Sequence, residues 1–364
     1  MNIGVPKERR PFEFRVGLTP AAVQMLAEEG NLCYVEHNAG VGAGFSDGEY
    51  ELAGARIVYS PHEVFGRADL LLKVARPTYE ELEWLRPGTT MMGLLHLSSS
   101  RQDKIDILQQ KEITAIPYEQ ITLADGTVPV RKPLSQIGGR LVAQISAHLL
   151  QNDAEGKGLL LGGIAGVPPA EVIIIGGGVF GTYATRAFMG IGAHVTVLDT
   201  NLEALIRIND DLPNVVTMMS NAINLKRVTA NADVVVAGIL VPNERPPIVI
   251  TRDMVRAMRP HSLIMDVSID EGGCVETSRP TTHDHSTFVE EGVIHYCVPN
   301  IPSIVARTAT FAYLNAAYPY ILEIASKGSE QAIADNPAIE RGAAIIKGKV
   351  HHLPRLKPIG FEGD

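Results

Sequence analysis

The stretch VIIIGGGVFGTYATRA, residues 172–187, decides the fold. Gly176, Gly178 and Gly181 form a G-x-G-x-x-G pattern that follows an apolar strand and opens a helix. The first glycine allows a tight turn, the second lets a pyrophosphate approach the backbone, and the third lets helix and strand pack closely. The amino end of the helix favours the bound anion. The stretch therefore predicts a dinucleotide-binding βαβ unit, although a glycine triplet alone is weak support.

The next apolar strand, HVTVLD at residues 194–199, ends on a carboxylate that strengthens this interpretation. Asp199 lies 18 residues after Gly181, where an acidic side chain accepts hydrogen bonds from both ribose hydroxyls of adenosine. The same charge would repel a 2′-phosphate, so we expect NAD rather than NADP as the cofactor. The alternative is a surface aspartate that caps the helix beginning near Asn201, and the two roles are compatible.

Apolar strands and helices alternate on both sides of this stretch, which is typical of parallel sheets. In the second half of the chain we expect six strands, at residues 172–175, 194–199, 215–219, 234–240, 262–267 and 293–297. In the first half we expect five strands, at residues 2–5, 33–37, 70–74, 91–95 and 113–116. The predicted fold class is α/β, with two Rossmann-like, doubly wound parallel-sheet domains separated by a cleft.

Two long helical patterns set the expected domain boundaries. Apolar residues at intervals of three and four predict an amphipathic helix over residues 134–149, which joins the two domains. A second pattern, residues 308–326, begins after the last strand, so we infer that it returns to the first domain. The prediction is a discontinuous substrate domain, residues 1–130 plus 306–364, and an NAD-binding domain, residues 131–305.

Composition and charge exclude several classes of partner. The 364 residues carry a net charge of −9, which leaves no basic excess for binding nucleic acid. Residues 158–181 are nearly uncharged, but Pro168, Pro169 and eight glycines argue against a membrane helix. We therefore expect neither nucleic acid nor membrane as a partner.

The cysteines and histidines give no sign of a metal site or a disulfide framework. Cys33, Cys274 and Cys297 lie far apart, which favours reduced thiols in a cytoplasmic protein. His283 and His285 are interpreted as solvated loop residues. We therefore expect no bound metal.

Several motifs together resemble one known family. They are IGVPKE (residues 3–8), RVGLTP (15–20), GAGFSD (42–47), LLGGIAGVPPAEV (160–172), GGGVFG (176–181), DVSIDEGGCVETSRPTTH (266–283) and HYCVPNIP (295–302). They resemble the alanine dehydrogenase family, which includes the NAD-binding subunit of proton-translocating transhydrogenase. The resemblance implies reversible, NAD-dependent oxidative deamination of L-alanine to pyruvate and ammonia. It also implies a homo-oligomer, typically a hexamer.

The resemblance assigns four residues to the reaction. It implies that Arg15 and Lys73 bind the substrate, that His96 exchanges protons, and that Asp270 lies beside the nicotinamide and the reacting carbon. Each residue alone has a simpler interpretation: a surface arginine, a solvated strand end, a hydrogen-bonded structural histidine and a turn aspartate. Their joint occurrence at the matching positions favours the catalytic interpretation.

The resemblance also implies a set of cofactor contacts, most of them in loops after strands. Besides the glycine turn and Asp199, they are Ser135, Val179, Ser220, Ile239, Leu240, Val267, Ser268, Ile269, Asp270, Arg279, Val298, Pro299, Asn300 and Ile301. Such loops suit contacts through backbone amides and carbonyls.

The sequence departs from the family pattern near the expected substrate pocket. Leu94 stands where a tyrosine is expected, Leu134 and Gln136 replace a methionine and a carboxylate, and Ser303 replaces a smaller residue. Another small amino acid therefore remains an alternative substrate. Two further alternatives are a transhydrogenase-type NAD-binding subunit and an NAD-binding protein without turnover.

Overall fold

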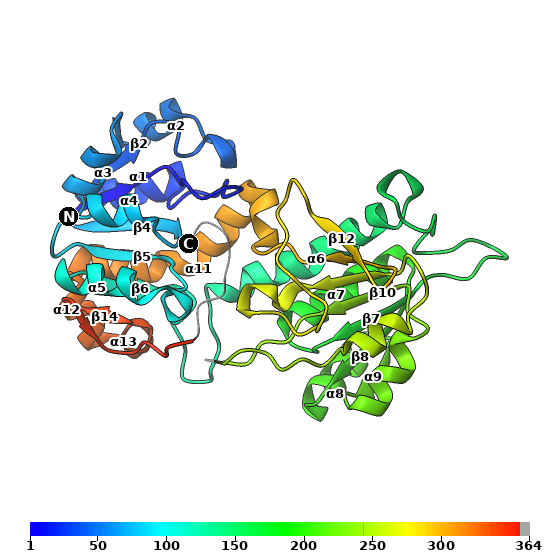
Figure 1. Ribbon diagram of the computed structural model, residues 1–364. Helices are drawn as coiled ribbons and strands as arrows, with labels where there is room; N and C mark the ends of the chain where they lie inside the picture. The colour runs from blue at the N-terminus through cyan, green and yellow to red at the C-terminus, as the bar shows by residue number, and fades with distance from the viewer. Residues whose placement is uncertain (243, 357–364) are drawn as a thin grey trace. The chain divides into compact units, whose positions relative to one another are not determined.

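The computed structural model describes residues 1–242 and 244–356. The chain divides into two compact units, and each is built on one mainly parallel sheet (Figure 1). Unit 1 comprises Met1–Leu134 and Pro302–Asp364, and unit 2 comprises Ser135–Ile301. The expected α/β class with two parallel-dominated sheets is confirmed.

Unit 1 contains an eight-stranded sheet in the order β15-β14-β6-β5-β4-β1-β2-β3. The strands are β1 (Asn2–Val5), β2 (Leu32–Glu36), β3 (Arg56–Val58), β4 (Leu70–Ala75), β5 (Thr90–Leu94), β6 (Thr114–Pro117), β14 (Ile345–Ile346) and β15 (Lys349–Val350). β1 to β6 pair in parallel, whereas β14 and β15 are antiparallel. The five expected strands are present, but the sheet is not purely parallel, because two short strands extend its β6 edge.

Helices cover the sheet of unit 1. They are α1 (Pro20–Glu28), η1 (Val41–Ala43), α2 (Asp47–Leu52), α3 (Pro61–Arg67), α4 (Tyr79–Trp84), η2 (Leu97–Ser99), α5 (Gln102–Gln110), α11 (Ala306–Lys327), α12 (Ser329–Asp335) and α13 (Pro337–Gly342). One apolar cluster joins α3, α4 and α5 to Leu71, Met91 and Ala115 of the sheet. α11 packs against α1 instead. The late helix expected over residues 308–326 is thus a part of unit 1.

Unit 2 contains a seven-stranded sheet in the order β12-β13-β11-β10-β7-β8-β9. The strands are β7 (Glu171–Ile175), β8 (His194–Asp199), β9 (Val216–Met219), β10 (Val234–Ala237), β11 (Leu263–Asp266), β12 (Thr287–Glu290) and β13 (Val293–Tyr296). The expectation of six strands is corrected by β12, which pairs antiparallel with β13 at the edge. From β7 the chain continues to β8 and β9 on one side of the sheet and then to β10, β11 and β13 on the other side, so the strand order reverses between β7 and β10. Ligands of open α/β sheets bind at such a reversal, beyond the carboxyl ends of the strands.

Helices cover both faces of this sheet. The helical segments are α6 (Arg131–Leu149), η3 (Asn152–Ala154), α7 (Val179–Ile191), α8 (Leu202–Asp211), α9 (Ala222–Thr229), α10 (Arg252–Arg256), η4 (Val267–Glu271) and η5 (Ile301–Val305). The unit boundary falls within α6 and close to the start of η5. α9 and α10 share an apolar cluster with Ile264 of β11. Ser146 of α6 donates to Met265 Sδ at 2.9 Å, so α6 lies on the opposite face, since successive strand residues alternate.

Among the described residues, no helix combines the length and the apolar character that crossing a bilayer requires.

Candidate functional site

The glycine turn lies between β7 and α7, where the sequence predicts it. Gly176 has a φ of +104°, and a Cβ there would lie 2.5 Å from the carbonyl oxygen of Gly238. At Gly181 a Cβ would lie 1.8 Å from the oxygen of Gly176, so a side chain is excluded. A Cβ on Gly178 would meet open space at the amino end of α7. The turn therefore has the close backbone packing and the open approach that a pyrophosphate requires.

Asp199 ends β8 and bonds to this turn. Its Oδ2 accepts from the amide of Gly177 at 2.6 Å, and its Oδ1 accepts from the amide of Asn201 at 2.7 Å. The cap of α8 is Asn201 itself, whose side chain accepts from Glu203 N. Asp199 therefore supports both the glycine turn and the approach to α8, but the capping alternative is wrong, because Asn201 is the cap of this helix. This position at the carboxyl edge of β8 is the one that an adenosine ribose requires of an acidic residue.

The loops after β9, β10 and β11 carry many of the other expected cofactor contacts. The amide of Ser220 donates to Asp199 O at 2.8 Å, directly after β9. After β11, the Ser268 hydroxyl accepts from Ile239 N at 2.8 Å and donates to Ile239 O at 3.0 Å. These bonds tie together loops that are distant in sequence at the carboxyl edge of the sheet. Val267 and Ile269 lie with Ser268 in η4, and Leu240 follows Ile239 in the β10 loop and is exposed.

Asp270 lies in η4, and its carboxylate accepts from the amide of Asn300 at 3.1 Å. Asn300 has a φ of +55°, a left-handed conformation that is uncommon outside glycine. Asp270 therefore holds the loop that also contains Val298, Pro299 and Ile301. The alternative of a turn aspartate is correct in that Asp270 orders a loop; its proposed contact with the reacting carbon stays a prediction.

Two glycines with positive φ form the turn between η4 and Cys274. Gly272 and Gly273 have φ values of +111° and +79°, and Asp266 Oδ2 accepts from the amides of Cys274 and Val275. Burial raises the pKa of Asp266.

Arg279, an expected cofactor contact, is exposed, and its guanidinium lies 4.2 Å from the centre of the Phe288 ring. The sequence analysis did not anticipate this cation–π contact between Arg279 and β12.

Ser135 lies in α6, one turn before a close helix contact. A Cβ on Gly139 would lie 2.5 Å from the carbonyl oxygen of Phe180, in the first turn of α7. A Cβ on Gly238 would lie 2.8 Å from the Phe180 ring. The sequence analysis missed Phe180, whose neighbours are glycines from two distant segments, α6 and the loop after β10. Val179, the first residue of α7, is partly exposed beside it.

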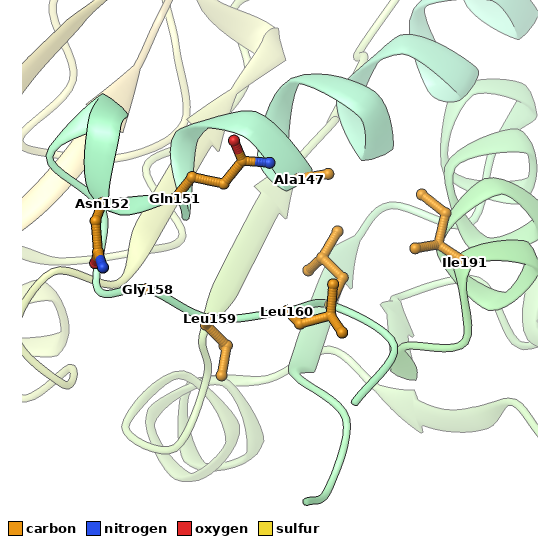
Figure 2. Close-up of a pocket in the computed structure, with 8 residues that line it drawn as sticks. Ala147, Gln151, Asn152, Gly158, Leu159, Leu160 and Ile191 are labelled. Atoms are coloured by element: carbon orange, nitrogen blue, oxygen red, sulfur yellow. The ribbon is translucent and has the colours of Figure 1, made fainter. Parts of the chain in front are cut away.

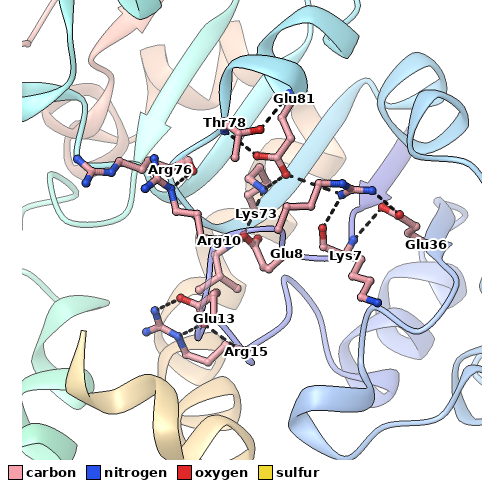
Figure 3. A network of polar contacts seen from close by, with 12 residues as sticks. Lys7, Glu8, Arg10, Glu13, Arg15, Glu36, Lys73, Arg76, Thr78 and Glu81 are labelled. Atoms are coloured by element: carbon pink, nitrogen blue, oxygen red, sulfur yellow. Dashed lines mark hydrogen bonds and ion pairs between the residues drawn. The ribbon is translucent and has the colours of Figure 1, made fainter. Parts of the chain in front are cut away.

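In unit 1, Lys73 lies within β4 and is buried (Figure 3). Its Nζ donates to Glu81 Oε1 at 2.6 Å and to Glu8 Oε2 at 3.1 Å. Burial opposes the charge of Lys73, but these two carboxylates outweigh burial and raise its pKa. Burial raises the pKa of Glu8, against the influence of Lys73. The alternative of a solvated strand end is wrong, and Lys73 is an ammonium whose described contacts use two of its three N–H donors.

Arg15 is also buried, with 3% of its surface exposed. Its Nε and Nη2 donate to the two oxygens of Glu13 at 2.7 and 2.6 Å, a bidentate pair within the chain (Figure 3). Burial opposes the charge, but Glu13 outweighs it and raises the pKa of Arg15. The alternative of a surface arginine is therefore wrong. The edge formed by Nε and Nη2 holds Glu13, so a substrate carboxylate would use the edge formed by Nη1 and Nη2.

His96 follows β5 in a strained conformation. Its φ of +44° and ψ of +41° place it in the left-handed region, which costs free energy for a residue other than glycine. The amide of His96 donates to Glu119 Oε1 at 2.6 Å, and its carbonyl accepts from the hydroxyls of Ser99 and Ser100 at 3.2 Å. Residues held in this way against strain cluster at functional sites, which favours a functional role for His96.

The electrostatic surroundings of His96 keep its imidazole neutral. Its pKa is lowered from 6.5 to about 3, first by burial and then by the positive charges of four arginines. The four, in order of effect, are Arg76, Arg131, Arg15 and Arg10. A neutral imidazole has a free ring nitrogen that can accept a proton, but this low pKa makes it a weak base while the arginine charges are not offset. An anion bound among these arginines would offset their field and raise the pKa of His96.

Tyr118 is a buried phenol that the sequence analysis missed. It directly follows β6, and its amide donates to Gly93 O at 2.7 Å, which makes it the cross-strand neighbour of Leu94. The hydroxyl of Tyr118 has no hydrogen-bond partner among the described residues. Its ring lies 6.2 Å from that of Tyr313 on α11, whose hydroxyl donates to Val16 O. The phenol that the family pattern places at residue 94 is thus absent there but present on the adjacent strand.

A hollow of unit 2 is lined by the last turns of α6 and α7 and by the segment between α6 and β7 (Figure 2). It is mainly apolar and is lined by Ala147, Gln151, Asn152, Gly158, Leu159, Leu160, Leu161 and Ile191. None of these residues is a predicted site residue or carries a titratable side chain. We therefore do not assign the hollow to the reaction.

The two units define a class of protein. Unit 2 has the strand order, glycine turn and acidic strand end of a dinucleotide-binding domain, and unit 1 holds a buried arginine, a buried lysine and a strained histidine. Together these features are those of a two-domain, nucleotide-dependent dehydrogenase. The chain belongs to the alanine dehydrogenase/PNT family: residues 4–138 match the model of its N-terminal domain and residues 142–353 that of its C-terminal domain.

Comparisons with individual proteins agree with this assignment. An alanine dehydrogenase of Methanococcus maripaludis is 44% identical over 352 residues, covering 96% of this chain and 94% of the relative. One of Bacillus subtilis is 41% identical and covers 100% of this chain and 96% of the relative. A solved L-alanine dehydrogenase structure superposes with a TM-score of 0.93 at 38% identity, covering 97% of each chain. A transhydrogenase of Sinorhizobium meliloti shares the fold, with a TM-score of 0.82 at 22% identity.

Proposed function

We propose that the chain catalyses the reversible, NAD-dependent oxidative deamination of L-alanine to pyruvate and ammonia. The observation that carries this proposal is the near full-length match to alanine dehydrogenases in a chain that retains Arg15, Lys73, His96 and Asp270. The experiment that tests it follows NADH oxidation with pyruvate and ammonium. In the oxidative direction, the reaction would serve the catabolism of L-alanine.

The substrate carboxylate would bind to the basic side of unit 1. Arg15 offers its Nη1/Nη2 edge, and Lys73 offers an N–H in addition to those that Glu8 and Glu81 accept. Both cations are positioned by buried carboxylates, which fixes their direction before a ligand arrives. Fixed donors cost little reorganisation when the substrate binds.

Proton transfer is assigned to His96. As a neutral imidazole it can take the proton that water releases when water attacks the iminium carbon of the substrate. It can then return this proton to the amino group and accept the hydroxyl proton as the carbon–nitrogen bond breaks, so that the carbinolamine collapses to pyruvate and ammonia. We assign to Asp270 the stabilisation of the positive iminium, because a carboxylate opposes the charge that develops on that intermediate.

The residues of unit 2 fit NAD. When bound, the nicotinamide supplies the hydride acceptor for the Cα hydrogen of alanine. The amino end of α7, with the open side of Gly178, would hold the pyrophosphate, and Asp199 would accept from the adenosine ribose. We assign to Ser135, Ser220, Arg279 and the loops after β10, β11 and β13 the remaining contacts.

Asp199 is expected to set the preference for NAD over NADP. Asp199→Gly removes both the negative charge and the bonds to Gly177 and Asn201, and should weaken NAD binding and relieve discrimination against NADP. Asp199→Asn is the matched variant, because it removes the charge but keeps an acceptor oxygen for the turn. The ratio of kcat/KM for NADH and NADPH should shift toward NADPH in both variants. An unchanged ratio would refute the role of this charge.

Self-association is proposed from the exposed apolar residues of unit 2. Leu160, Ile164 and Val167 are 63, 67 and 52% exposed in the segment beside the hollow of Figure 2. Exposed apolar groups of this size are typical of surfaces that other subunits cover. We propose a homo-oligomer, a hexamer, whose mass light scattering would measure; a monomer would contradict it.

The three free cysteines are buried, and we place the protein in the reducing cytoplasm.

A further inference from the structure

Two histidines and a glutamate converge in unit 1. Glu340 lies on α13, and His351 and His352 directly follow β15. Nε2 of His351 lies 3.0 Å and Nε2 of His352 lies 2.9 Å from the same Oε1 of Glu340. These three ligand atoms lie within 4.8 Å of one another. None of the three residues belongs to the groups assigned to the reaction or to the cofactor.

Backbone bonds fix the two sides of this cluster. The amide of His351 donates to Ala344 O at 2.9 Å, and the amide of His352 donates to Ala343 O at 3.2 Å. Ala343 directly follows α13, so the segment that carries both imidazoles is bonded to the end of the helix that carries the carboxylate. The amino end of this helix is capped by Asn336, whose side chain accepts from Ala338 N. The ligand atoms are therefore held by ordered backbone rather than by chance rotamers of a loose tail.

The donor set suits a divalent metal ion of intermediate softness. Imidazole nitrogens with a carboxylate oxygen suit Zn²⁺, and three protein ligands leave a position for water. The side chains of Glu340, His351 and His352 are 40, 39 and 47% exposed, so an ion and its waters can reach them. The centres of the two imidazole rings lie 4.0 Å apart. Both rings therefore lie close enough together to bind a single ion.

We propose that Glu340, His351 and His352 form a Zn²⁺ site that fastens the segment after β15 to α13. The ligands of a structural metal ion are brought together only in the folded chain. An ion that binds the folded chain and not the unfolded chain stabilises the folded state. The sequence analysis expected no metal and did not consider His351 and His352. The third ligand becomes visible only when β14 and β15 bring residue 351 back to residue 340.

The test uses the full chain, first treated with a chelator and then titrated with ZnCl₂ by calorimetry. We expect one equivalent of Zn²⁺ per chain and a rise in Tm with added metal. His351→Ala and Glu340→Gln should each weaken binding at least about tenfold, since losing one of three ligands removes a large share of the affinity. Because all three side chains are partly exposed, these variants should fold.

A matched control separates this site from ordinary surface pairs. His194 forms a similar exposed pair with Glu171, at 2.7 Å, but without a second histidine. His194→Ala should leave the stoichiometry and the affinity unchanged. Absence of Zn²⁺ binding in the parent chain, or equal affinity in the parent and in the His351→Ala and Glu340→Gln variants, would overturn the proposal and leave only a surface ion pair.

Discussion

Replacing His96 with alanine is expected to lower turnover roughly 10²–10⁴-fold, the range typical of a lost proton-transfer group. Binding of NADH should stay unchanged, because the expected nucleotide contacts lie in unit 2. His96→Gln is the matched variant, since it keeps size and polarity without proton exchange, and it should be equally slow. His285→Ala, on an exposed loop, should retain full turnover. Near-normal rates in both His96 variants would exclude this residue from proton transfer.

The pH dependence of stability gives an independent view of His96. Its pKa is about 3 in the folded chain and near 6.5 when unfolded. Between these pH values the unfolded state binds the extra proton, so the free energy of unfolding falls as the pH decreases from about 6.5 toward 3. Denaturant titrations at pH 7 and pH 4.5 should show a smaller fall for His96→Gln than for the parent. An equal fall would contradict the lowered pKa.

Replacing Lys73 with methionine is expected to impair both stability and activity. The change leaves Glu8 and Glu81 buried without their shared cation. Breaking a buried ion pair by removing one partner costs about 3–5 kcal/mol, so a large decrease in the free energy of unfolding should appear at neutral pH. The exposed Lys327→Met, which also removes a lysine with two carboxylate partners, should have little effect.

A double variant separates the structural role of Lys73 from its proposed role in binding. Lys73→Met with Glu81→Gln removes one of the two buried carboxylate charges that lose Lys73, the one that Arg9 also approaches at 3.8 Å, so it should recover part of the lost stability. It should not recover turnover, because the ammonium that would contact the substrate is still absent. Recovery of stability and turnover together would show that Lys73 acts only as a counter-ion.

Local patterns in the sequence were sufficient to predict the glycine turn of unit 2 and the strands on either side of it. Gly176 and Gly181 are required by contacts within a few residues or with the adjacent strand, and Asp199 follows at the end of the next strand. Long buried strands such as β7 and β8 are also evident as apolar runs. β3, β12, β14 and β15 are short and lie toward the edges of their sheets, so they lack such runs and were missed.

The reaction side depends on contacts between distant residues, which the sequence does not display. Lys73 was predicted, but its partner Glu8 lies 65 residues away in the chain. Arg15 was expected to grip a substrate with two parallel bonds, yet Glu13 takes that geometry within the protein. The left-handed conformation of His96 and the position of Tyr118 beside Leu94 follow from the pairing of β5 with β6. Residue types indicated the chemistry here, and tertiary contacts determined which groups are already engaged.

The sequence differs from the family pattern at Leu94, Leu134 and Ser303, all of which are buried in unit 1. Such exchanges change selectivity among small side chains by only about 1–3 kcal/mol each. The choice between pyruvate and a neighbouring 2-oxo acid is therefore decided by rates rather than by inspection of the fold.

The most direct test of the central claim follows the loss of NADH absorbance with pyruvate and ammonium, and repeats it with glyoxylate, 2-oxobutyrate and hydroxypyruvate. We predict fast, ammonium-dependent oxidation of NADH with pyruvate and slower rates with the other three acids. Selective turnover of another acid would assign the pocket changes to substrate choice and contradict alanine as the substrate. No turnover with any of the four acids, with NADH still bound, would contradict the dehydrogenase assignment and favour a transhydrogenase-type or binding-only role.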